Sequence, residues 1–207
     1  MKSLEQLIDT QDDAIVQIRT WQQEAELSVT LLPAAANSGE QLQQLQLSTH
    51  SVLGALVYHT GGVLIADGWL RFLGSGCPQL TRALVSWNHS NSGYLLVADD
   101  VVGGFFAIND GALGSDVGDL YYLPPDALDW EPLEVGFSDF FAWSMSENLL
   151  QFYADVDITR LLSEYRHCST EHALHFYPPL WSQEGNVSQS ARRLVPLTEL
   201  RALKLAN

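Results

Sequence analysis

Side chains that could bind zinc lie close together in the C-terminal part of the chain. They are His167, Cys168, His172 and His175, and imidazole and thiolate groups are good zinc ligands. A zinc site would need the last three to converge, with Glu171 as the fourth ligand or as a base. The spacing matches no standard zinc motif, and in a strand the odd spacing of His172 and His175 would place them on opposite faces. We therefore interpret these residues as structural and expect no metal and no cofactor.

A second group of reactive side chains consists of carboxylates near the glycine-rich centre of the chain. The group comprises Asp99, Asp100, Asp110, Asp116 and Asp119. Carboxylates at the tips of turns could bind calcium or act as an acid–base pair, but no segment has the spacing of an EF-hand loop. Short carboxylate side chains also accept hydrogen bonds from nearby backbone N–H groups. We therefore interpret most of them as turn residues and expect no catalytic residue among them.

Nucleophile and phosphate-binding motifs are also incomplete. Ser75 and Cys77 occur in a Gly-Ser-Gly-Cys segment, which lacks the Gly-x-Ser-x-Gly pattern of a nucleophile elbow. The glycines at 61–62 and 74–76 are not followed by the Gly-Lys-Ser/Thr of a phosphate loop. These patterns favour a protein that is not an enzyme, although they leave an enzyme as the alternative.

Five residues are better candidates for binding than for catalysis. Trp130 and Trp181 lie near predicted loops, where an aromatic ring with a polar edge suits an interface. Arg192 and Arg193 could hold a carboxylate bidentately, beside the Tyr-Pro-Pro-Leu-Trp segment that begins at Tyr177. A structural ion pair is the alternative interpretation of the two arginines.

The charge balance limits the classes of partner. The chain has 207 residues and a net charge of −15, from 25 acidic and 10 basic residues. Such a charge opposes binding to nucleic acid or to anionic lipid, because phosphate contacts need clustered Lys and Arg. The acidity serves either solubility or an acidic face that meets a basic protein partner.

Other features of the composition point to the cytoplasm. No apolar run approaches the roughly 20 residues that span a bilayer, and the N-terminal segment lacks the apolar region of a secretory signal. Cys77 and Cys168 lie far apart in sequence, and we expect two free thiols rather than a disulfide framework. We therefore expect a cytoplasmic protein with no contact to a membrane.

The elements that must carry these residues centre on the stretch 93–153, which predicts a β-meander leading into a helix. Its first strand is apolar on both faces, which predicts a sheet that is covered on both sides. A hairpin around Asp67-Gly68 precedes it. The expected strands are 63–66, 69–73, 94–98, 105–108, 120–123 and 128–131.

Helical periodicity and capping signals flank this meander. Ser138 is the expected N-cap of the aromatic helix. The expected helices are 4–27, 40–58 as one or two, 79–87, 138–145, 147–156 with an extension to 166, and 197–205; further strands are expected at 29–32, 175–177 and 191–195. We predict a single α+β domain over residues 1–207, with an antiparallel or mixed central sheet at about 63–131 packed by helices.

Long motifs in the second half of the chain resemble those of one protein family. Residues 98–114, 118–131, 176–185 and 190–196 together resemble a family of uncharacterised bacterial proteins that is defined only as a domain of unknown function, DUF2625. The resemblance covers most of the chain. It implies no established activity.

A looser resemblance concerns the middle of the chain alone. A Gly-Gly-Phe-Phe-x-Ile-Asn strand, a Gly-x-Leu-Tyr-Tyr strand and a Phe-x-x-Phe-Phe-x-Trp helix are similar to the pattern of the SUKH superfamily. Many bacterial members of that superfamily are thought to be immunity proteins that bind secreted toxins, and others are regulatory interaction modules. The segment from His172 onward is not part of that pattern.

These observations lead to two competing expectations. The first is a non-enzymatic, cytoplasmic module that binds another protein, immunity-like if the SUKH resemblance holds. The alternative is a small-ligand binder or an enzyme with a pocket lined by Tyr177, Trp181, Arg192 and Arg193. A homo-oligomer with a self-complementary aromatic surface is a further alternative.

Overall fold

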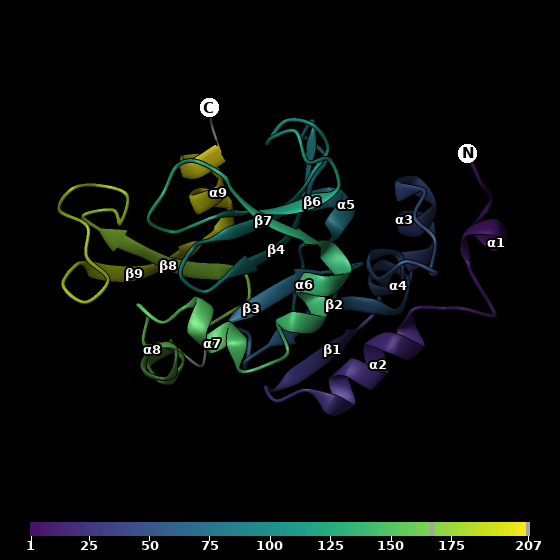
Figure 1. The fold of residues 1–207 in the computed structure, drawn as a ribbon, viewed down its shortest axis with the longest axis horizontal. Coiled ribbons are helices and arrows are strands. Elements are labelled where there is room, and N and C mark those ends of the chain that lie inside the picture. The colour runs from purple at the N-terminus through teal and green to yellow at the C-terminus, as the bar shows by residue number, and fades with distance from the viewer. Residues whose placement is uncertain (166–167, 206–207) are drawn as a thin grey trace.

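A seven-stranded antiparallel sheet forms the centre of the computed structural model, which describes residues 1–165 and 168–205 (Figure 1). The strands lie in the sheet in the order of the chain, so β1 and β7 are the two edges. They are β1 (Val29–Pro33), β2 (Thr60–Ile65), β3 (Leu70–Leu73), β4 (Tyr94–Asp100), β5 (Phe105–Asn109), β6 (Asp119–Leu123) and β7 (Glu131–Gly136). The expected α+β class with an antiparallel central sheet is confirmed.

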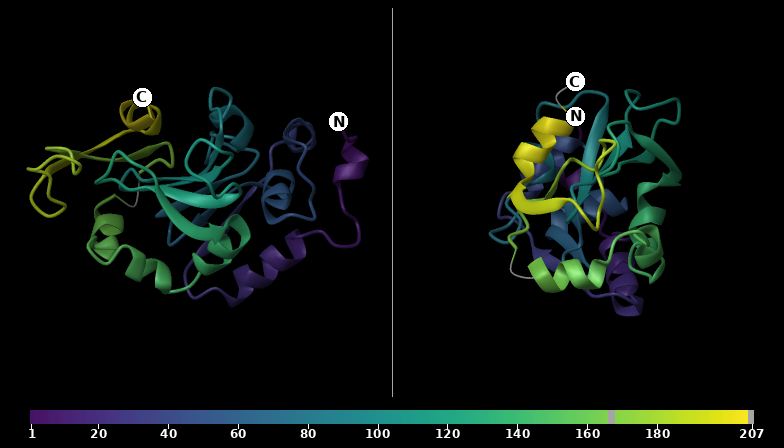
Figure 2. Two further views of the ribbon diagram at one scale, coloured as in Figure 1. Left: turned by 45° about the horizontal axis from the view of Figure 1, so that its top comes forward. Right: turned by 90° about the vertical axis from the view of Figure 1, so that its left-hand side faces the viewer.

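Helices surround this sheet, and a separate two-stranded hairpin follows it. The hairpin consists of β8 (His172–Tyr177) and β9 (Ala191–Pro196). The helices are α1 (Leu4–Leu7), α2 (Ile15–Glu24), α3 (Ser38–Leu45), α4 (Val52–His59), α5 (Leu84–Trp87), α6 (Phe137–Trp143), α7 (Asn148–Phe152), α8 (Ile158–Tyr165) and α9 (Leu197–Leu205). The hairpin and α9 lie at one end of the molecule and α1 and α3 at the other (Figure 2).

One face of the sheet is aromatic and is covered by α6. Side chains alternate between the faces of a strand, and the register aligns Phe72 with Ala98, Ala98 with Phe106, and Phe106 with Tyr122. Phe141 of α6 meets Phe72 edge-on at 4.9 Å between ring centroids. Burying these rings supplies much of the core, since each aromatic side chain removes a large apolar area from water.

The opposite face carries charged side chains under the C-terminal segment. Arg71 and Asp99 face each other across β3 and β4, and both are almost completely buried. Arg71 Nη1 donates to the carbonyl oxygens of Thr170 at 3.1 Å and His172 at 2.7 Å. Both faces of the sheet are therefore covered, as the apolar first strand of the meander predicted.

Several element boundaries differ from the prediction. The strand expected at 128–131 is β7, which runs from Glu131 to Gly136. The expected helix 4–27 is interrupted because the Asp9 carboxylate accepts the N–H groups of residues 11 and 12 in a turn. The expected helix 79–87 begins only at Leu84. Helix α6 begins at Phe137 with Gly136 as its N-cap, not Ser138, because β7 runs directly into the helix. In the described residues no helix is long and apolar enough to cross a membrane.

Candidate functional site

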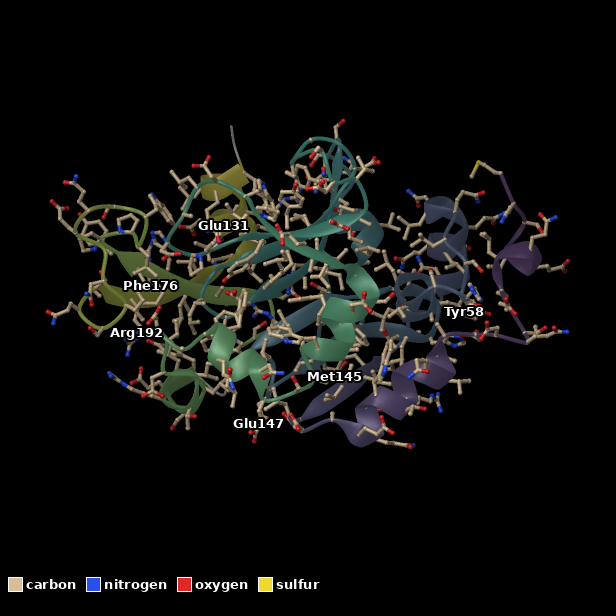
Figure 3. All side chains as sticks on the ribbon, in the orientation of Figure 1. Tyr58, Glu131, Met145, Glu147, Phe176 and Arg192 are labelled. Atoms are coloured by element: carbon tan, nitrogen blue, oxygen red, sulfur yellow. The ribbon has the colours of Figure 1, made fainter. Side chains whose placement is uncertain are left out.

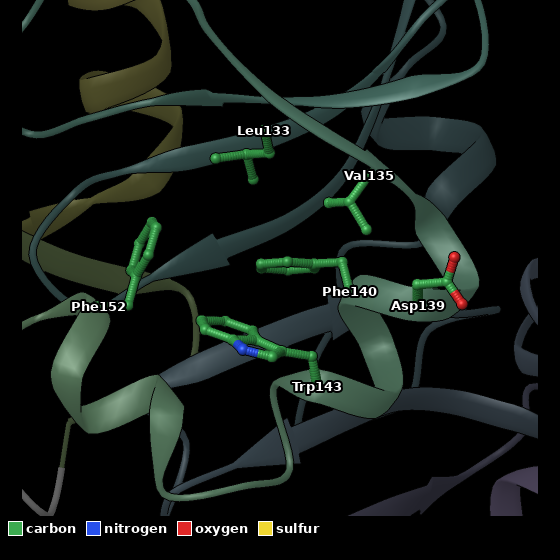
Figure 4. A pocket seen from close by; sticks show the side chains of 6 residues that line it. All are labelled: Leu133, Val135, Asp139, Phe140, Trp143 and Phe152. Atoms are coloured by element: carbon green, nitrogen blue, oxygen red, sulfur yellow. The ribbon is translucent and has the colours of Figure 1, made fainter.

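The candidate site is an apolar pocket between the edge strand β7 and the helices α6 and α7 (Figure 4). Its volume is about 400 Å³, which falls in the size range of ordinary ligand pockets. The lining residues are Leu133, Val135, Asp139, Phe140, Trp143 and Phe152. Figure 4 shows the five apolar side chains directed toward one space, with Asp139 at its margin.

A bulge in β7 provides the upper wall of the pocket. Asp119 pairs with Gly136 and Tyr121 with Pro132, so a longer stretch of β7 lies opposite a shorter stretch of β6. Glu134 lies in the bulge with a φ of 54°, in the left-handed region that non-glycine residues seldom adopt. The chain on either side of Glu134 directs Leu133 and Val135 into the pocket (Figure 4).

The lower wall is an aromatic stack on α6 and α7. Phe140 and Trp143 lie three residues apart, which places them on the same face of α6. Their rings stack with centroids 5.6 Å apart, and Phe152 meets Trp143 edge-on at 5.9 Å. Phe140 is buried, whereas Trp143 and Phe152 remain partly exposed. The pocket therefore offers exposed aromatic surface on a rigid base.

A second pocket of about 300 Å³ continues from the first and shares Leu133 and Phe152 with it. Its other lining residues are Tyr122, Pro124, Pro125, Asp126, Glu131, Tyr153, Asp155, Val156, Leu180 and Val187. We call the two pockets together the β7 groove. Figure 3 shows Glu131 at the end of β7 that is nearer to the hairpin.

The buried carboxylate of Asp100 fixes the positions of Tyr122 and Tyr153, which form the back wall of the groove. The Tyr122 and Tyr153 hydroxyls donate to Asp100 Oδ2 at 3.0 Å and 2.8 Å, and the N–H groups of Val102 and Gly104 donate to Oδ1. Burial raises the pKa of Asp100, although these donors oppose the shift. Burial and then the Asp100 charge raise the pKa of both tyrosines well above the usual value. Both hydroxyls are therefore protonated donors at neutral pH and fix the wall.

Lys204 of α9 lies behind the second pocket. Its ammonium group donates to the Pro124 carbonyl oxygen and lies 5.8 Å from the centroid of the Trp181 ring. Burial lowers the pKa of Lys204 to about 8, because a charged group loses its hydration. This contact fixes α9 and the Trp181 loop against the end of β6.

A buried ion cluster lies on the opposite face of the sheet. Arg71 Nε lies 2.7 Å from Asp99 Oδ1 in an ion pair, and Arg82 Nη1 donates to Asp99 Oδ2 at 2.5 Å. Arg82 Nε lies 3.2 Å from Glu171. Burial lowers the pKa of Arg82, although the Asp99 charge opposes the shift. Arg82 Nη2 also donates to the Thr170 carbonyl oxygen at 2.7 Å. Because the groups point at one another, the cluster attaches the C-terminal segment to the sheet rather than presenting a reactive side chain.

The five predicted binding residues do not form one site. Trp130 packs on Tyr94, with ring centroids 5.6 Å apart, and is not among the residues that line the hairpin pocket. Tyr177, Arg192 and Arg193 line a pocket of about 380 Å³ on the hairpin. The Trp181 ring lies 6.0 Å from His175, which lines the same pocket.

The two arginines occupy opposite faces of β9, as consecutive strand residues must. Arg192 Nη2 donates to Glu164 at 2.7 Å, whereas Arg193 Nη2 lies 3.6 Å from Glu199. The Glu164 hydrogen bond raises the pKa of Arg192, and Arg192 in turn lowers the pKa of Glu164. The guanidinium groups therefore contact different carboxylates of the chain, although both residues line the same pocket. Figure 3 shows Arg192 on the hairpin beside Phe176.

The remaining reactive residues also have structural contacts. Within the described ranges, no group of three or more His, Cys, Asp or Glu side chains could hold a metal; His167 lies outside those ranges. Ser75 is buried and donates to the Thr60 carbonyl oxygen at 2.8 Å. Asp99 and Asp100 are not exposed turn residues but are fully buried at the end of β4, although Asp100 does accept bonds from the following turn.

Comparison with known proteins gives a family but no activity. A family model described as "Protein of unknown function DUF2625" matches residues 4–200. A "Putative uncharacterized protein YbfG" from Escherichia coli (strain K12) is 42% identical over 205 residues, covering 97% of this chain and 94% of that protein. An "Uncharacterized protein" from Haemophilus influenzae is 40% identical over 162 residues, covering 74% and 71%. No solved structure matches the chain.

Proposed function

The chain belongs to the DUF2625 family of proteins of unknown function, and from that premise we propose that it is a non-enzymatic, cytoplasmic protein that binds another protein through the β7 groove. The observation that carries the proposal is the aromatic pocket under β7. Trp143 and Phe152 keep part of their rings exposed there, and aromatic residues in a concave pocket are typical anchors of protein interfaces.

The chemistry of the pocket supports binding rather than catalysis. Among its described lining residues, Asp139 alone has an ionisable side chain, and that side chain is exposed at the margin. The hydroxyls of Tyr122 and Tyr153 behind the neighbouring pocket are directed inward to Asp100. In this first pocket a partner would therefore find mainly apolar surface and, among the described lining residues, no activated nucleophile or base.

The edge of β7 favours docking of side chains over the addition of a strand. Pro132 has no N–H group to donate, and the left-handed Glu134 bends the strand. Proline, bulges and charged residues are the means by which proteins protect exposed sheet edges. We therefore expect the partner to insert side chains into the groove rather than to extend the sheet.

The SUKH resemblance supports a more specific form of this proposal. The Phe-x-x-Phe-Phe-x-Trp helix that carries the resemblance is α6, and its Phe140 and Trp143 line the pocket. In this more specific version of the proposal, the chain is immunity-like and the protein that it binds is a secreted toxin domain.

Comparative purification tests the proposal. The chain is used as bait in an extract of its source organism, beside a Val135→Asp variant and a matched Val16→Asp variant. Val135 lines the pocket, whereas Val16 is 68% exposed on α2. We expect one stoichiometric protein to remain with the wild-type chain and with Val16→Asp and to be lost with Val135→Asp. If both variants are folded and retain the partner protein equally, the β7 groove is excluded as its binding site.

A second candidate function is a small-ligand site on the hairpin, because Tyr177, Arg192 and Arg193 do line a pocket of about 380 Å³. In a thermal-shift screen of metabolites, a true ligand should raise the melting temperature of the wild-type chain. The same ligand should not raise the melting temperature of the Tyr177→Ala variant. The Tyr177 side chain is 74% exposed and contributes little to the core, so this variant should still fold. An equal rise in melting temperature for the wild-type chain and the Tyr177→Ala variant would exclude the hairpin pocket as the ligand site.

A further inference from the structure

The β7 groove is apolar at one end and acidic at the other. The end under Val135 is lined by Leu133, Phe140 and Trp143, whereas the end near the hairpin carries exposed carboxylates. Those carboxylates belong to Asp126, Glu131 and Asp155. They come from three places in the chain: the turn after β6, the start of β7 and the turn after α7.

Lys204, whose charge interacts with that of Asp126, offsets this acidic end only in part. In the part of the chain that the structure describes, the ion pairs of Lys and Arg involve other carboxylates. Lys204 lies close behind the pocket but is only 4% exposed, and its ammonium donates to the Pro124 carbonyl oxygen. The surface that a partner meets there is therefore negative.

A partner that covers this acidic surface removes water from its carboxylates, which costs free energy. Carboxylates that lose water without gaining a partner are strongly unfavourable, whereas cationic side chains on the incoming surface offset that loss. The overall charge of −15 acts in the same direction, since it attracts cationic partners and repels acidic ones at long range.

We infer that the β7 groove takes a basic protein segment, with an apolar side chain in the Val135 end and Lys or Arg side chains over Asp126, Glu131 and Asp155. The inference rests on the proposed function. Leu133 and Phe152 line both pockets, so one continuous segment can contact both ends at once.

Photo-crosslinking in the source organism tests the composition of that segment. A photoreactive amino acid replaces Val135 in the full chain, and a second chain carries it at Val16 as the control. Mass spectrometry of the crosslinked product should identify a segment in which Lys and Arg outnumber Asp and Glu. A neutral or acidic segment would overturn the inference and leave the proposed function intact. If residue 135 yields no more product than residue 16, the proposed function itself fails.

A charge-matched pair of variants then tests the role of the three carboxylates with the purified partner. One chain carries Asp126→Asn, Glu131→Gln and Asp155→Asn. The control carries Glu5→Gln, Glu40→Gln and Asp110→Asn, which are exposed outside the groove and change the net charge equally. We expect the groove variant to lose tenfold or more in affinity, with a weaker salt dependence, and the control to lose far less. Equal losses in the two variants, or no loss in either, would contradict a basic occupant.

Discussion

The ring of Trp143 stacks on the ring of Phe140, with centroids 5.6 Å apart and an interplanar angle of 28°. Phe140 also lies 5.0 Å from Phe106 of the sheet and is 3% exposed. Trp143 is farther from the sheet core and keeps part of its surface in solvent. Helix α6 thus presents one ring that belongs to the core and one that is available to a partner.

Substitutions of these two rings should separate stability from binding. Phe140→Ala should lower the free energy of unfolding by about 3–5 kcal/mol, the usual cost of removing a core phenylalanine. Trp143→Ala should cost clearly less, because its ring is partly exposed already, yet it should weaken partner binding strongly. Urea denaturation and titration with the purified partner measure the two effects. Equal destabilisation by both substitutions would mean that Trp143 is simply a core residue.

The buried ion cluster should be sensitive to loss of its central charge. Asp99→Asn keeps the shape of the side chain but leaves Arg71 and Arg82 without their shared anion, so we expect a loss of about 3–5 kcal/mol in the free energy of unfolding. Denaturant titration gives the value.

A matched control for this prediction is the exposed carboxylate of Glu164, which pairs with Arg160 and Arg192. Glu164→Gln should have a far smaller effect, because solvent screens exposed ion pairs. The explanation of the cluster is wrong if the two substitutions destabilise the chain to a similar degree.

Most of the sheet could be predicted from sequence because its signals are local, although the last strand lies at Glu131–Gly136 and not at 128–131. The alternating strands, the Asp67-Gly68 turn and the aromatic helix all follow from side-chain periodicity and turn chemistry. The ion cluster could not be predicted in the same way. Arg71, Arg82, Asp99 and Glu171 are distant in sequence, and only the strand register and the path of the C-terminal segment bring them together.

The candidate site shows the same division. The aromatic residues of α6 were recognisable, but the pocket depends on the bulge at Glu134, which has no glycine to signal it. Arg192 and Arg193 are neighbours in sequence and yet lie on opposite faces of β9. Adjacent positions in a strand diverge, so a pair that looks like a clamp in sequence becomes two separate ion pairs.

The hairpin and the central sheet should open together if residues 1–207 form one domain, as the sequence predicts. The Leu174 N–H donates to the Val101 carbonyl oxygen at 2.7 Å, which joins β8 to the turn after β4. Native-state hydrogen exchange should therefore give Leu174 an opening free energy close to that of Phe106. A value several kcal/mol lower for Leu174 would indicate a separately unfolding C-terminal unit.

The buried Lys204 should make stability depend on alkaline pH. Its pKa of about 8 in the folded chain lies below the ordinary 10.5. Between those values the unfolded chain holds more protons, so the free energy of unfolding should rise by about 2 kcal/mol from pH 8 to pH 10. Above pH 10 the raised pKa values of Tyr122 and Tyr153 act in the opposite direction, since the unfolded chain then loses tyrosine protons first.

The Lys204→Met variant isolates that contribution. Loss of the bond to the Pro124 carbonyl oxygen should shift its stability by a constant amount, whereas the rise between pH 8 and pH 10 should disappear. Guanidinium chloride denaturation of both chains at pH 7.5, 8.5 and 9.5 provides the comparison. Parallel pH profiles would show that Lys204 does not titrate in this range.

The β7 groove is tested most directly by hydrogen–deuterium exchange of the chain alone and in complex with its purified partner. We predict that partner binding slows exchange in β7, α6 and α7, which line the groove, and in the loop that carries Leu180 and Val187. Strands β8 and β9 of the hairpin should remain unchanged. Protection confined to the hairpin, with no change over residues 131–153, would contradict the account.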